Sequence, residues 1–172
     1  MNREEKLEDF YLRSEKTANT SKKDEAFNII SAEIDLCEDR YLNEYIAPLN
    51  FIRYEKVLDW IERSSHRIEN ISENWGHLAA SSNFSWDRAN TWLSKGRPLS
   101  LIALDALKFC TTTGERLNQS PWMREIQPSM IDNPKSEIVA KRLQEYLKID
   151  NVPRTRNSID TVINNIFGLD AN

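Results

Sequence analysis

Apolar residues recur at every third or fourth position along most of the chain, which is the spacing of one face of an α-helix. The pattern predicts a first helix over residues 3–16 and a second over residues 21–47. Ser21 followed by Asp24 is a typical N-terminal cap, and Pro48 is a stop because proline cannot continue a helix. The apolar positions of these two helices are Leu7, Phe10 and Tyr11, then Phe27, Ile30, Ile34, Cys37, Tyr41 and Tyr45.

The remaining helices are separated by residues that usually start or stop a helix. Ser85 is a favourable N-cap, and Gly96 follows a basic last turn. Pro98, Pro134 and Pro153 stand at helix-starting positions. No segment has the alternating pattern of a strand, so we predict an all-α fold that forms a compact multi-helix domain. The later helices are expected at 51–68, 71–80, 86–95, 98–110, 134–147 and 153–167, with a short one at 122–131.

The composition agrees with one helical domain. The chain has 172 residues, of which 40% are hydrophobic and 29% charged, enough for an ordinary core under a solvated surface. Its 4 glycines and 6 prolines are too few for a sandwich or barrel with many tight turns. We therefore expect residues 1–172 to form a single α-helical domain, with residues 1–20 as an N-terminal helical arm.

The most apolar stretch, GRPLSLIALDAL at residues 96–107, has apolar residues around most of its helical circumference. Such a helix must be covered on several sides, so we expect it at the centre of the fold. Asp105 interrupts this stretch, and a buried carboxylate needs a partner. We interpret Asp105 as structural, paired with Arg88 or Arg97, because no second acid or histidine accompanies it in sequence as a catalytic role requires.

The helix boundaries within residues 84–150 repeat. Pro98 opens a helix directly after the one that ends at Gly96, and Pro134 opens another after a short break. This arrangement resembles the paired antiparallel helices of HEAT and armadillo proteins, whose pairs stack into a solenoid. The resemblance implies a scaffold with a concave binding surface and no particular chemistry. An irregular helical bundle is the alternative, because the connection at 114–132 does not fit a repeat.

The net charge of −4 bears on the class of partner. Proteins that bind nucleic acids usually carry a basic surplus, because neutralising phosphates supplies much of their affinity. The acidic balance disfavours a nucleic acid and suits another protein, a basic one included. A HEAT-like nucleic-acid-binding protein or DNA glycosylase is the alternative, and it needs a local basic patch formed by Arg88, Lys95, Arg97 and Lys108.

Two glutamate–histidine pairs could each offer two metal ligands on one helical face. They are Glu62 with His66 and Glu73 with His77, and they define a further alternative, a helical metal-binding enzyme. The di-metal carboxylate pattern, however, needs a three-residue spacing on facing helices. The sequence also lacks nucleophile elbows and phosphate-binding loops. We therefore expect a non-enzymatic protein without a metal or another cofactor.

Tryptophan and arginine are the residue types that most often anchor protein interfaces. Trp122, Arg124 and Glu125 lie in the irregular connection, where binding residues are commonly presented. We predict this segment as the first contact surface and Arg88 with Trp92 as the second. The sequence leaves open whether the Trp92 indole lies in the core.

Together these observations predict a protein-binding module, and one concrete form is a bacterial immunity or inhibitor protein that neutralises a protein partner. The opening segment MNREEKLEDF is charged, which argues against a signal peptide. No window approaches the about 20 apolar residues of a membrane span. Cys37 and Cys110 are isolated, which predicts buried free thiols. We expect a cytoplasmic protein that binds no membrane, while its oligomeric state stays open.

Overall fold

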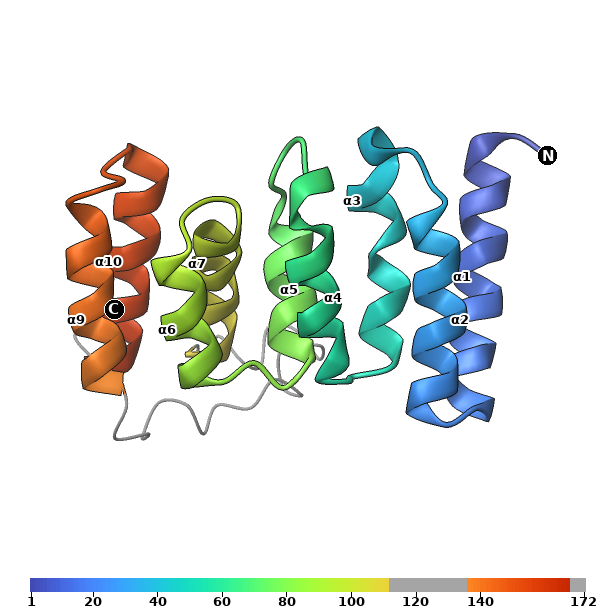
Figure 1. Cartoon of the computed structure of the whole chain (residues 1–172), viewed down its shortest axis with the longest axis horizontal. Coiled ribbons are helices and arrows are strands. Elements are labelled where there is room, and N and C mark those ends of the chain that lie inside the picture. Colours follow the sequence, from blue (N-terminus) through green and yellow to red (C-terminus); the bar gives the residue numbers. More distant parts are fainter. Residues whose placement is uncertain (112–135, 168–172) are drawn as a thin grey trace.

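The computed structural model describes residues 1–111 and 136–167, and all regular elements within these ranges are helices. They stand side by side in a row, from α1 (Arg3–Thr20) at one end to α9 (Ser136–Leu147) and α10 (Pro153–Phe167) at the other (Figure 1). The prediction of an all-α, compact multi-helix fold is confirmed. None of the described helices combines the length and the apolar character that a membrane span needs.

The first part of the row contains shorter elements than the sequence predicted. The predicted helix over residues 21–47 is interrupted, and that prediction is wrong. The elements in its place are α2 (Lys23–Asp35), the 3-10 turn η1 (Asp39–Tyr41), α3 (Leu42–Tyr45) and the 3-10 segment η2 (Ala47–Phe51).

A side chain from elsewhere in the chain stabilises the break after α2. The Arg67 guanidinium donates hydrogen bonds to the carbonyl oxygens of Cys37 (2.7 Å) and Ile34 (3.5 Å). Carbonyl groups at a helix end have no partner within the helix, so a donor at this point favours termination. Ser21 is not the N-cap of α2 either, because it ends α1 and Lys22 precedes α2 without a side-chain cap bond.

The helix predicted over residues 51–68 begins only at Lys56, whereas the following helices keep close to their predicted boundaries. Ser85 caps α6 by accepting a hydrogen bond from the backbone N–H of Arg88 (3.1 Å), as predicted. Gly96 has φ of 77°, a left-handed conformation that favours glycine, and it connects α6 to α7. The elements here are α4 (Lys56–Ser64), the 3-10 turn η3 (Ser65–Arg67), α5 (Glu73–Ser81), α6 (Trp86–Ser94) and α7 (Leu99–Cys110).

The later helices form two layers. In one layer α5 packs against α7, and α7 packs against α10; in the other, α6 packs against α9. The layers are joined by contacts of α6 with α7 and of α9 with α10. The first layer continues toward the N-terminus, where α5 contacts η2 and η2 contacts α1. Each later helix pair thus places one helix in each layer.

α7 is the central helix that its apolar sequence predicts. Every residue from Leu99 to Leu107 is buried, and the helix contacts α5, α6 and α10. α5 and α7 approach closely at Gly76, where an added Cβ would lie only 2.4 Å from the Cβ of Asp105. The glycine therefore allows α5 and α7 to pack at a distance that no other residue permits.

Candidate functional site

Three buried indoles donate hydrogen bonds between neighbouring elements of the row. Trp60 donates to Asp35 (3.0 Å) and Trp92 donates to Glu62 (2.6 Å). Trp75 donates to the side-chain oxygen of Asn43 (2.6 Å). All three tryptophans are fully buried, so these bonds satisfy indole N–H groups that would otherwise be costly to bury.

Trp92 is consequently a core residue. It was predicted as part of the second contact surface, but its indole has no exposed surface with which to touch a partner. Its ring packs against Phe84, with ring centroids 5.3 Å apart. Sequence periodicity alone did not decide whether Trp92 lies in the core or at a contact surface, because tryptophans of amphipathic helices occur in both positions.

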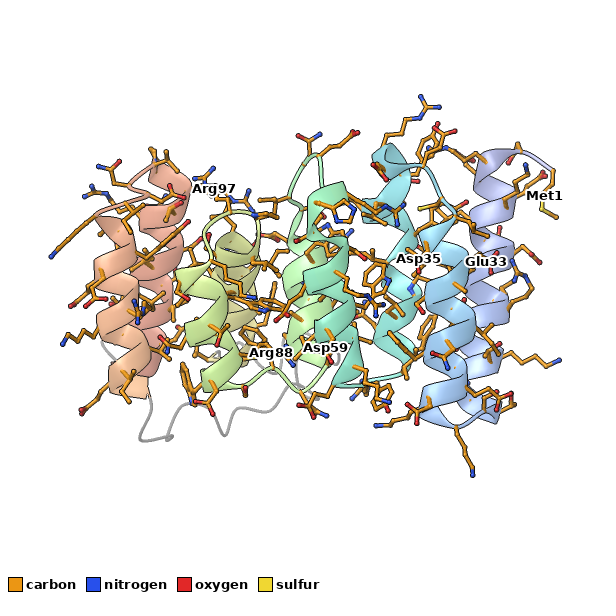
Figure 2. The ribbon with its side chains drawn as sticks, viewed as in Figure 1. Met1, Glu33, Asp35, Asp59, Arg88 and Arg97 are labelled. Carbon is orange, nitrogen blue, oxygen red and sulfur yellow. The ribbon has the colours of Figure 1, made fainter. Side chains whose placement is uncertain are left out.

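Arg88, the other half of that predicted surface, is held by two carboxylates of α4. Its Nη1 lies 3.0 Å from Asp59 and 2.9 Å from Glu62, and Figure 2 shows Arg88 and Asp59 near each other at the lower edge of the row. Burial alone would raise the pKa of Glu62, but the hydrogen bonds from Trp92 and Arg88 hold it below its usual range. This cluster therefore joins α4 to α6.

Asp105 is buried as expected, but its predicted partners are wrong. Its carboxylate faces Arg154 of α10 (3.1 Å) and Lys108 of its own helix (3.5 Å), rather than Arg88 or Arg97. Burial raises the pKa of Asp105, and the positive charges of Lys108 and Arg154 offset only part of this effect. The ion pair between Arg154 and Asp105 links α10 to α7. The two residues are far apart in the sequence, so the periodicity of a single helix could not predict their contact.

Arg97 belongs to a separate network at the junction of α7, α9 and α10. Its guanidinium contacts both carboxylate oxygens of Asp150, at 2.5 and 2.7 Å. The Tyr146 hydroxyl donates to Asp150 and also bonds the Ser100 hydroxyl, each at 2.7 Å. The hydrogen bond from Arg97 lowers the pKa of Asp150 to about 2. Thr155 completes the set by donating to the same carboxylate (3.2 Å).

The four basic residues named for nucleic-acid binding do not gather into one patch. Arg88 lies at the lower edge of the row and Arg97 at its upper edge (Figure 2). Each is paired with carboxylates of its own neighbourhood, and Lys108 lies beside Asp105 and Glu73. Among the described residues, these four side chains therefore do not form one continuous positive surface of the kind that phosphate binding requires.

The two glutamate–histidine pairs do not form a metal site. Within the described residues, no group of three or more His, Cys, Asp or Glu side chains could hold an ion together. Glu62 is engaged with Arg88 and Trp92. The half-buried His77 ring stacks on Phe109 with centroids 3.8 Å apart, and burial lowers its pKa.

The two cysteines differ in environment. Cys110 is buried, and its burial raises the pKa of the thiol to about 12, which removes the thiolate needed for nucleophilic chemistry. Cys37 is only half-buried beside Arg67, so the prediction of a buried thiol holds for Cys110 alone. Burial also raises the pKa of Cys37.

The first predicted contact surface, Trp122 with Arg124 and Glu125, lies outside the described residues, as does the predicted helix at 122–131. The described part of the chain instead contains a hollow that sequence analysis missed. It lies between the C-terminal ends of α6 and α9 and has a volume of about 320 Å³. We call it the α6–α9 pocket; its main lining residues are Leu93, Lys95, Arg142, Glu145, Tyr146 and Ile149.

The α6–α9 pocket combines a buried floor with an exposed edge. Leu93 and Tyr146 are almost fully buried, whereas Ile149 is 84% exposed. A mostly exposed isoleucine beside an apolar hollow is a feature of contact sites, because covering it removes apolar surface from water. The sequence signal for this pocket was weak. It consisted of Ile149, an isoleucine two residues after the end of the helix predicted over 134–147.

Comparison of the chain with models of known protein families, with curated protein sequences and with solved structures finds no match. The ionisable clusters described above join helices to one another, whereas the α6–α9 pocket has an exposed isoleucine, Ile149, at its edge.

Proposed function

We propose that the chain is a non-enzymatic protein-binding module that contacts its partner through the α6–α9 pocket. The observation that carries the proposal is this pocket, with Ile149 exposed at its edge. Interfaces obtain most of their affinity from a few anchors that fill such hollows. The charged clusters around Asp105, Arg88 and Arg97 serve packing in this account.

The proposal includes the HEAT- or armadillo-like character of the chain. Its support is the pairing of α6 with α7 and of α9 with α10, with successive pairs in contact in both layers. In such stacks each unit contacts only its neighbours and the outer surface is left for partners. One concrete form of the function is an immunity or inhibitor protein that neutralises another protein.

A binding screen with whole polypeptides tests the function. The purified chain is used as bait against a displayed library of genome fragments from the organism that encodes it, and the product of the neighbouring gene is tested as a purified protein. We expect at least one polypeptide that binds with micromolar or tighter affinity in calorimetry with purified components. Failure of both sources to supply any binder would contradict the proposal.

A further inference from the structure

We propose that the α6–α9 pocket takes an apolar side chain from a short acidic segment of the partner, an inference that rests on the proposed protein-binding function. The apolar walls of the pocket come from the two helices that pack against each other there. Leu93 belongs to α6, and Tyr146 belongs to α9. Ile149 lines the same pocket and adds an exposed apolar edge to it.

The pocket is held in shape by the Arg97 network. Asp150, directly after Ile149, is fixed by Arg97 from the turn that follows α6. Tyr146 is fixed at its hydroxyl by Ser100 and Asp150. The α9 side of the pocket is therefore tied to α7 and to the turn before it, independently of any partner, and a preformed site loses less conformational freedom on binding.

The charges at the rim select the chemistry next to the apolar anchor. Arg142 shares its guanidinium between Glu145 (3.4 Å) and Asn90 (3.1 Å). Lys95 has no carboxylate within ion-pair distance among the described residues. The rim thus has two cations and one anion, so a carboxylate beside the anchor is the complementary group.

The size and polarity of the pocket favour a polypeptide over a small molecule. A volume of about 320 Å³ is at the lower end of small-molecule sites. Such sites carry polar groups that orient the ligand from within, whereas the charged groups here, Lys95, Arg142 and Glu145, lie at the rim. An anchor side chain needs no orienting group inside the hollow, because the rest of the segment fixes its position.

A selection from random linear peptides displayed on phage tests the inference. The wild-type protein serves as bait, and selected peptides are synthesised and measured by fluorescence polarisation. We expect sequences with a large apolar residue next to Asp or Glu. Ile149→Glu should weaken their binding by about tenfold or more, because it places a charge at the apolar edge.

Two further variants make the test specific. Lys95→Glu should abolish the preference for acidic neighbours. Ile138→Glu is the matched control, because Ile138 is a 59% exposed isoleucine at the start of α9, outside the pocket, and it should leave affinity unchanged. Peptides that bind all three variants equally well, or that lack acidic residues, would overturn the inference.

The possible outcomes separate this inference from the proposed function. If a whole partner from the genome-fragment screen binds the Ile149→Glu variant as tightly as the wild type, the pocket inference fails while protein binding stands. If no peptide binds but 4-phenylbutyrate shifts the nuclear magnetic resonance signals of Leu93 and Ile149, the pocket is a small-molecule site and the inference is overturned. If neither library yields a binder and the product of the neighbouring gene does not bind, the proposed function fails as well.

Discussion

Arg154 of the last helix donates a hydrogen bond to the buried carboxylate of Asp105 on the central helix, at 3.1 Å. The same guanidinium donates to the carbonyl oxygen of Ile71, just before α5 (3.4 Å). One side chain therefore connects three parts of the first layer. The Arg154 side chain is about half exposed, whereas the Asp105 side chain is buried. The free-energy cost of removing a charge from water therefore falls mainly on the Asp105 carboxylate.

This asymmetry predicts the pH dependence of an Asp105→Asn variant. Because the pKa of Asp105 is raised in the folded protein, its contribution to stability is fully present below its unfolded pKa, about 3.9, and is lost as pH rises through the folded value. The Asn variant should therefore gain stability relative to wild type between acid and neutral pH. Urea unfolding of both proteins across this range is the measurement. A relative gain by the wild type would show that the ion pairs outweigh burial.

Asp150 should behave in the opposite way. Its pKa is lowered to about 2 in the folded protein, mainly by the hydrogen bond from Arg97. Its stabilising contribution is therefore present above the unfolded pKa, about 3.9, and is lost as pH falls toward the folded value. Asp150→Asn should lower the melting temperature at neutral pH and approach wild type in strong acid. An equal deficit at both pH values would mean that the substitution acts through packing rather than charge.

Gly76 should tolerate no side chain. In Gly76→Ala the new Cβ would meet the Cβ of Asp105 at 2.4 Å, so α5 and α7 must separate, at a cost of about 1–3 kcal/mol or more. Gly96→Ala is a useful comparison, because nothing lies within 4 Å of its added Cβ and the cost comes only from its positive φ. Denaturant unfolding should show a larger loss for Gly76→Ala than for Gly96→Ala.

Trp92 should act as a core residue in mutagenesis. Trp92→Ala removes a fully buried indole and leaves a cavity, which is expected to cost about 3–5 kcal/mol of unfolding free energy. Trp92→Phe should cost less, because the ring is retained and Glu62 keeps its bond to Arg88. Calorimetric melting of the two variants checks the order. A Trp92→Ala protein with unchanged melting would mean that the indole is not part of the core.

Local sequence signals predicted much of the fold. Ser85, Pro98 and Pro153 marked helix starts that the structure confirms, because capping and proline geometry act within a few residues. The predicted continuity through Cys37 failed because Arg67 stabilises the break from a distance in sequence. The spacing of apolar residues reports on one helix at a time. It therefore does not predict contacts between residues that are far apart in the sequence, such as Arg67 and Cys37.

The candidate site was less predictable than the fold. The need of Asp105 for a cationic partner followed from its apolar surroundings, but the identity of that partner depended on where α10 packs. Similarly, the large apolar side chain of Ile138 is exposed, whereas the smaller Ala140 of the same helix is buried. The α6–α9 pocket arises where two helix ends meet, and no single segment encodes it.

Hydrogen–deuterium exchange of the complex is the most direct test of the central claim that the chain binds a protein through the α6–α9 pocket. The measurement compares the free protein with its complex with a partner from the genome-fragment screen. The account predicts new protection at residues 93–96 and 142–149, with little change in α1 and α2. Protection confined to α1 and α2, with the pocket residues exchanging as in the free protein, would contradict it.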